Sequence, residues 1–111
     1  MEINSSVKEN NVFIQLNGNL LGENANGPVL DFIKEKLAAH KNFAIDLSDV
    51  KYINSTGLGM FISAQVRINN AGGKLALYNM PENILKLLKM MKLDATFLIV
   101  NSEEDAINAL K

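Results

Sequence analysis

The stretch from Phe43 to Gly59 constrains the fold more than any other part of the chain. It begins with a short, mostly apolar segment at 43–47, which is typical of a buried strand. A polar connection follows, and then Ser55 and Thr56 stand immediately before apolar residues at helical spacing. A strand that leads into a helix and on to another strand implies parallel neighbours with a right-handed crossover. The stretch therefore predicts an α/β fold with two adjacent hydroxyl groups at the start of a helix.

The remaining segments extend this pattern in both directions along the chain. Alternating residues on either side of Glu9-Asn10-Asn11 predict an opening β-hairpin with one buried face, and a glycine- and asparagine-rich loop is expected over 18–27. Further strands are predicted at 74–78 and 96–100, the latter buried. Helices are predicted from Pro28 to near His40, from about Ser55 to Gly72, from Pro81 onward and from Ser102 onward. The expected order is β-β-α-β-α-β-α-β-α in a single α/β domain spanning residues 1–111.

Two of the predicted helices have apolar positions whose burial the structure can test. In the helix that begins near Ser55, the face predicted to point inward is formed by Leu58, Phe61, Ile62 and Val66. In the helix that follows Pro81, the inward face is formed by Ile84, Leu85, Leu88 and Met91. In the last helix, Ser102 is expected to be the N-cap of a first turn rich in acidic residues.

Composition narrows the classes of function. With 11 basic and 12 acidic residues the net charge is −1, which argues against a nucleic-acid partner. The absence of cysteine excludes disulfides, thiolate chemistry and cysteine–zinc sites. The first residues do not form a signal peptide, and no segment has the ~20 apolar residues that span a bilayer. A cytoplasmic protein without membrane insertion is therefore expected.

No set of residues predicts catalysis, a metal or a cofactor. His40 is the single histidine, and its position favours an interaction with the end of a helix dipole. Asp46 and Asp49 could suggest acid–base or metal chemistry, but two carboxylates without a third partner are more often turn formers. Neither 57–59 nor 72–74 completes a phosphate-binding loop. The chain is therefore predicted not to be an enzyme.

Ser55 and Thr56 are the residues with the clearest candidate role. One of the two hydroxyls could be an ordinary N-cap, worth about 1 kcal/mol. Alternatively, a hydroxyl at this position could be a site of modification, because the start of a helix favours a phosphate group. The residues alone leave both interpretations open.

The sequence around these hydroxyls resembles the signature of the STAS domain, a family that includes the bacterial anti-sigma factor antagonists. The resemblance rests on Asn54-Ser55-Thr56-Gly57-Leu58-Gly59, preceded by 44–47 and 50–53. Supporting similarity occurs at Gly18-Asn19-Leu20, Pro28-Val29-Leu30 and Gly72-Gly73-Lys74-Leu75. The resemblance implies a mixed sheet of four or five strands with about four helices, packed largely on one side.

The resemblance also implies a function based on protein interaction. Family members of the antagonist type bind an anti-sigma factor that is also a serine kinase, and phosphorylation of a serine at the helix start ends the interaction, which a serine phosphatase restores. By position, Ser55 matches the phosphorylated serine, and Thr56 is a second candidate. The residues implied to bind the partner are Glu23, Asn54, Ser55, Thr56, Gly57 and Leu58.

Two positions depart from the family pattern. Asn54 stands where the family usually has aspartate, and Leu21 stands where the family tends to have aspartate after the second strand. The loop here is about two residues longer, and Glu23 is a candidate replacement for the missing acid. These departures support an alternative hypothesis, a constitutive STAS module of a transport or signalling complex that is not phosphorylated.

Overall fold

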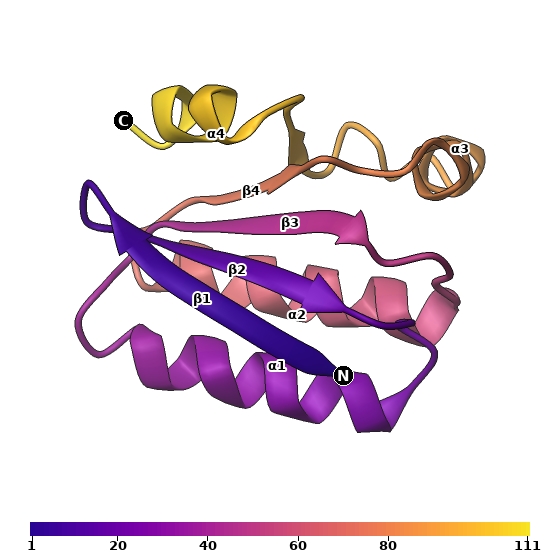
Figure 1. The fold of residues 1–111 in the computed structure, drawn as a ribbon, viewed down its shortest axis with the longest axis horizontal. Coiled ribbons are helices and arrows are strands. Elements are labelled where there is room, and N and C mark those ends of the chain that lie inside the picture. The colour runs from indigo at the N-terminus through magenta and orange to yellow at the C-terminus, as the bar shows by residue number, and fades with distance from the viewer.

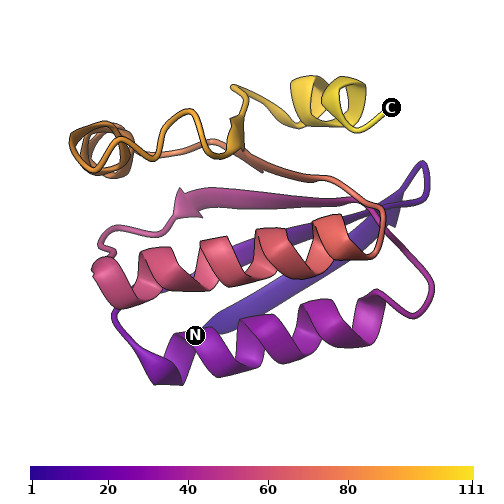
Figure 2. The ribbon, with the colours of Figure 1, turned by 180° about the vertical axis from the view of Figure 1, so that it is seen from behind.

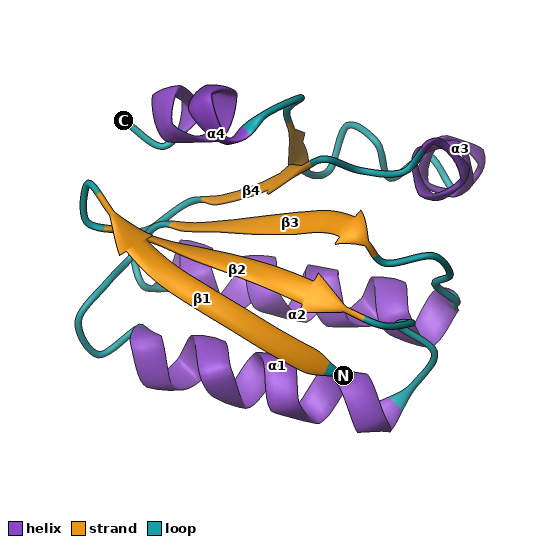
Figure 3. Cartoon of the chain, viewed as in Figure 1, coloured by secondary structure: helices purple, strands orange, loops and turns teal.

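A computed structural model describes the backbone of residues 1–111 and all side chains except those of residues 23–25. Figure 1 shows the arrangement of the elements, and Figure 3 separates helices from strands. In chain order the elements are β1 (Glu2–Lys8), β2 (Asn11–Asn17), α1 (Glu23–Lys36), β3 (Phe43–Asp49), α2 (Ser55–Asn70), β4 (Leu75–Tyr78), α3 (Glu82–Met90), β5 (Leu98–Ile99) and α4 (Glu103–Ala109). The predicted order β-β-α-β-α-β-α-β-α is confirmed.

The five strands form one mixed sheet in the spatial order β1-β2-β3-β4-β5. β1 and β2 pair antiparallel through the predicted hairpin, whereas β2–β3, β3–β4 and β4–β5 pair in parallel. Because paired residues point to the same face, alternate apolar residues of β2 and β3 line one side of the sheet together. Val12 pairs with Phe43 and Ile14 with Ile45, and all four are buried.

The helices cover the two faces of the sheet unequally. α1 and α2 lie side by side on one face, where the larger core forms (Figures 1 and 2). α4 packs on the opposite face, where Ala106 and Leu110 join Phe13 and Tyr78 in a second, smaller cluster. The family resemblance implies helices packed largely on one side of the sheet. This expectation holds for α1 and α2 and fails for α4.

The start of α1 corrects the prediction for the loop over 18–27. The helix begins at Glu23, so Pro28 lies inside it rather than in its first turn, and it ends at Lys36, before His40. The amide of Asn26 donates to the Gly22 carbonyl at 3.1 Å, and its side-chain Nδ2 donates to the Thr56 carbonyl at 2.9 Å. This contact with α2 helps to stabilise a helical turn that the local composition disfavours.

The buried face of α2 is also displaced from the prediction. Leu58 and Phe61 are buried as expected, but Ile62 is exposed and 51% of Val66 is accessible. The helix is instead buried through a face that includes the small residues Gly57 and Ala64. Small side chains let the backbone approach its neighbours closely, so α2 turns Gly57 and Ala64 inward and leaves Ile62 and Val66 on the solvent side.

Two smaller predictions near the C-terminus are wrong. The strand expected over 96–100 contains only Leu98 and Ile99, and Leu98 is exposed because β5 lies at the edge of the sheet. In α3, Ile84 and Leu88 are buried as predicted, whereas Met91 follows the end of the helix and is exposed.

Candidate functional site at the start of α2

Two loops are joined by backbone hydrogen bonds at the start of α2. The amide of Leu20 donates to the Tyr52 carbonyl at 3.0 Å, and the amide of Asn54 donates to the Leu20 carbonyl at 3.2 Å. Leu20 and Ile53 form an isolated parallel bridge. The segment after β2 therefore fixes the position of the segment after β3, from which α2 begins.

Asn54 is the N-cap of α2, so neither predicted hydroxyl has that role. Its Oδ1 accepts a hydrogen bond from the Gly57 amide at 2.9 Å, and its Nδ2 donates to the Leu21 carbonyl at 2.7 Å. An aspartate could accept the first bond but could not donate the second. The departure from the family pattern at position 54 thus gives the cap a second hydrogen bond.

Ser55 and Thr56 are the first two residues of α2, and both side chains are exposed. Among the described residues, the Ser55 hydroxyl makes no hydrogen bond, and the amides of Ser55 and Thr56 have no acceptor. The first turn contains no acidic residue. Within the described residues, the site therefore combines an unbonded hydroxyl with N–H donors that lack acceptors, at the positive end of the helix dipole.

Gly57 and Leu58 lie beneath this surface rather than on it. A Cβ atom at Gly57 would overlap the carbonyl oxygen of Leu20 and would lie 2.8 Å from Ile53 Cγ1. Leu58 is only 2% exposed and belongs to the main core. These two residues position the helix start, while the exposed surface is formed by Asn54, Ser55 and Thr56. The side chain of Glu23 lies outside the described residues.

Sequence reasoning missed two apolar residues that flank the site. Leu21 and Tyr52 are 53% and 62% exposed, and each belongs to one of the two joined loops. Bulky apolar residues in the polar segments beside the motif were the signal that could have identified them. Together with the exposed hydroxyls they give this end of the molecule a partly apolar surface of the kind found in protein interfaces.

The other candidate residues have structural partners. His40 Nδ1 lies 3.1 Å from Asn10 Oδ1, Asp46 Oδ1 accepts from the Ser48 amide at 2.9 Å, and Asp49 accepts from Gln15 at 3.0 Å. Within the described side chains, no three His, Cys, Asp or Glu residues are placed to hold a metal ion. Over the same residues, none of the helices has the length and hydropathy required to cross a bilayer.

Comparison with known proteins agrees with this geometry. The model of the STAS domain family matches residues 2–106. The anti-sigma-B factor antagonist of Bacillus subtilis is 38% identical over 93 residues, which cover 78% of this chain and 81% of that protein. The chain belongs to the STAS domain family.

Two solved structures share the fold at low sequence identity. A Thermotoga maritima protein described as a candidate anti-sigma factor antagonist has a TM-score of 0.88 at 21% identity, covering 97% of this chain and 93% of that one. The Bacillus cell fate determinant SpoIIAA, solved in its phosphorylated form, has a TM-score of 0.76 at 18% identity, covering 99% and 100%. These similarities establish the arrangement of the elements.

Proposed function

We propose that this protein is an anti-sigma factor antagonist that binds its anti-sigma factor through the surface at the start of α2 and is released when Ser55 is phosphorylated. The observation that carries the proposal is the exposed Ser55 hydroxyl, which makes no hydrogen bond to the described residues because Asn54 supplies the cap. Thr56 is the second candidate acceptor. The similarity to the Bacillus subtilis antagonist supports the class of partner.

Phosphorylation at Ser55 is compatible with the folded protein. A phosphate adds about −1.5 to −2 charges at pH 7. At this position the new charge meets the amides of Ser55 and Thr56, which have no acceptor among the described residues, and the positive end of the helix dipole. No acidic residue in the first turn opposes it. The modification therefore leaves the fold intact, and its effect is on binding.

The new charge is expected to weaken binding of the partner. In the complex, a surface that had accepted a neutral hydroxyl beside Leu21 and Tyr52 would have to accommodate a dianion. A loss of about 3 kcal/mol from desolvation or like charge weakens binding more than 100-fold. The proposed kinase is the anti-sigma factor itself, and a serine phosphatase restores the unmodified form.

The first experiment maps the site of modification. The protein is incubated with ATP and the cognate anti-sigma kinase, and phosphate is located by mass spectrometry in wild type, Ser55→Ala and Thr56→Ala. We expect phosphate on Ser55 in wild type and in Thr56→Ala. Modification confined to other residues would contradict the proposed switch.

The second experiment separates binding from stability. Because an acid at the start of α2 favours the helix dipole, Ser55→Asp is expected to raise stability by about 0.5 kcal/mol while weakening partner binding about 100-fold in calorimetry. Ser63→Asp introduces the same charge at an exposed position about two turns further along α2 and is expected to bind like wild type. Equal binding by Ser55→Asp and wild type would favour a constitutive module instead.

A further inference from the structure

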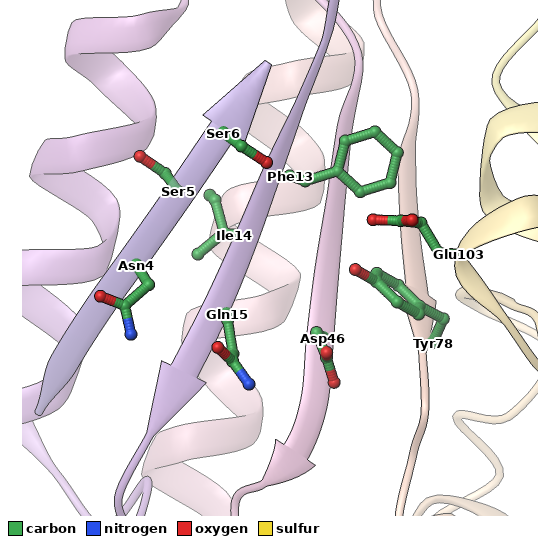
Figure 4. A pocket seen from close by; sticks show the side chains of 9 residues that line it. All are labelled: Asn4, Ser5, Ser6, Phe13, Ile14, Gln15, Asp46, Tyr78 and Glu103. Atoms are coloured by element: carbon green, nitrogen blue, oxygen red, sulfur yellow. The ribbon is translucent and has the colours of Figure 1, made fainter. Parts of the chain in front are cut away.

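The face of the sheet opposite α1 and α2 contains an open cavity of about 230 Å³. It lies where α4 ceases to cover the sheet, and Figure 4 shows the side chains that line it. Asn4, Gln15, Asp46 and Tyr78 are paired in register across β1 to β4, so they form one polar row across the sheet. Glu103 completes the cavity from the first turn of α4.

Of the described residues that line this cavity, Tyr78 is the one polar residue whose side chain is buried. Tyr78 is only 5% exposed, yet its hydroxyl has no hydrogen-bond partner among the described residues. Buried tyrosine hydroxyls ordinarily have such a partner. In Figure 4 the hydroxyl points into the cavity, between the carboxylates of Asp46 and Glu103. The hydroxyl oxygen is not among the fully enclosed polar atoms of the described residues, so it is open to the cavity and can hydrogen-bond to water or to a ligand that enters there.

The remaining polar atoms of the cavity are mainly acceptors. Asp46 uses Oδ1 for the Ser48 amide, and Glu103 uses Oε1 for Lys8, so each carboxylate keeps a second oxygen. Burial, reinforced by the charges of Asp46 and Glu103, raises the pKa of Tyr78 to about 12. The phenol is therefore protonated at neutral pH and can donate to a carboxylate while its oxygen accepts from a ligand.

The protein already holds one cation at the margin of this cavity. Lys8 Nζ lies 2.6 Å from Glu103 Oε1 and 5.5 Å from the centroid of the Phe13 ring. A carboxylate beside an aromatic face is a favourable environment for an organic cation. Asp46 and the Tyr78 hydroxyl offer a similar combination further into the cavity, without a resident cation.

We propose that this cavity binds a small organic cation with a guanidinium or ammonium group, held by Asp46 and Tyr78 beside Glu103. The carboxylates disfavour anions, and the volume is below the range of about 300–1,000 Å³ that holds drug-sized ligands. A guanidinium group carries several donors in a plane and can contact both a carboxylate and a phenol oxygen.

The test uses n-butylguanidine as the probe and n-butylurea as its neutral counterpart of similar shape. Amide chemical shifts of the whole protein are followed by nuclear magnetic resonance. We expect butylguanidine, but not butylurea, to shift amides near Gln15, Asp46 and Tyr78 saturably. Equal binding of the two probes, or shifts confined to another part of the protein, would overturn the proposal.

Four variants make the test specific. Asp46→Asn and Tyr78→Phe each remove one proposed ligand group and are expected to weaken binding at least about tenfold. Lys8→Met removes the competing cation and is expected to strengthen binding, which a purely structural role for Lys8 would not do. Glu104→Gln, at an exposed residue that does not line the cavity, should leave the affinity unchanged. Unaltered binding by Asp46→Asn would contradict the assignment.

A second probe distinguishes a free solute from an arginine side chain of another protein. A capped Gly-Arg-Gly peptide presents the same guanidinium group within a chain. If it binds as tightly as butylguanidine, the cavity accepts a protein side chain, whereas much weaker binding assigns it to a free cation. Ser55→Asp is expected to bind butylguanidine normally, so failure of this proposal is distinguishable from failure of the phosphorylation switch.

Discussion

The starts of α2 and α4 use the same residue types in different positions. In α4, Ser102 stands one residue before the helix, and its hydroxyl accepts from the Asp105 amide at 3.1 Å. In α2, Asn54 occupies the equivalent position, and Ser55 is already inside the helix, where its hydroxyl makes no hydrogen bond to any side chain or backbone group that the structure describes. A shift of one residue separates a structural serine from an available one.

The first turns of α2 and α4 also differ in charge. The first turn of α4 contains Glu103, Glu104 and Asp105, which already complement its dipole. The first turn of α2 contains no acid, so its own residues leave the positive end of its dipole without a compensating charge. A phosphate on Ser55 would supply the charge that α4 has in its sequence. On electrostatic grounds, the proposed phosphate would therefore be better accommodated at the start of α2 than at the start of α4.

The largest expected effect on the free energy of unfolding comes from replacing the two glycines of α2, which should respond in opposite directions. Gly57→Ala places a Cβ atom against the Leu20 carbonyl and Ile53, so we expect a loss of about 3 kcal/mol in the free energy of unfolding. Gly59→Ala meets no atom within 4 Å and should instead stabilise the helix by about 1 kcal/mol. Urea denaturation of both variants measures the difference.

The close approach at Gly57 has no counterpart among the residues of α4, so this pair of variants tests whether α2 is held at its start by the neighbouring loop. If Gly57→Ala were as stable as wild type, the loop at Leu20 would have to move to accommodate the Cβ atom. The start of α2 would then not be fixed by that loop.

The second-largest loss of stability is expected when the N-cap side chains of α2 and α4 are removed. Asn54→Ala removes the bonds to Gly57 and Leu21, and we expect it to cost about 2 kcal/mol. Ser102→Ala removes one bond and should cost about 1 kcal/mol. Thermal unfolding followed by circular dichroism compares them.

Ser55→Ala is the matched control for the caps, and we expect a change within about 0.5 kcal/mol, as for most surface substitutions. A loss as large as that of Ser102→Ala would mean that the Ser55 hydroxyl also supports the helix, contrary to its lack of a partner.

The sequence was sufficient for the architecture because its strands and helices carry strong local patterns. The position of the β1–β2 hairpin, the apolar segment at 43–47 and the start of α2 at Ser55 all correspond to the structure. The single buried face predicted for the hairpin is wrong, because β1 is largely exposed and β2 is buried on both faces. The candidate site could be proposed for the same reason, since its motif is continuous in the chain. The identity of the cap was not predictable, because serine, threonine and asparagine are all good N-caps and only the contact with Leu21 selects Asn54.

The errors arise where tertiary contacts override local preference. The start of α1 is anchored through Asn26 on Thr56, a residue 30 positions away. The exposure of Ile62 and Val66 follows from a rotation of α2 toward its small residues. The polar row on the outer face, from Asn4 to Tyr78, joins residues from four strands and depends entirely on register. No local pattern contains such information.

The smallest expected effect is a change in the pKa of Tyr78 when the charge of Glu103 or Asp46 is removed. Burial, then Asp46, then Glu103 raise the pKa of Tyr78 to about 12. In a Tyr52→Phe background, the ultraviolet absorbance of tyrosinate reports Tyr78 alone. We expect Glu103→Gln to lower this pKa, and Asp46→Asn to lower it further, because Asp46 is the stronger of the two charges.

The same shift predicts how stability depends on pH. An unfolded chain releases the tyrosine proton near pH 10, whereas the folded protein retains it to about pH 12, so the contribution of Tyr78 to stability is complete below pH 10 and is lost as the pH rises through 12. Tyr78→Phe in the same background should therefore show a shallower loss of stability over this interval in urea denaturation. Identical pH dependence in the two proteins would mean that the Tyr78 phenol is not held protonated by the fold, and that the charges of the α4 first turn do not reach the outer face of the sheet.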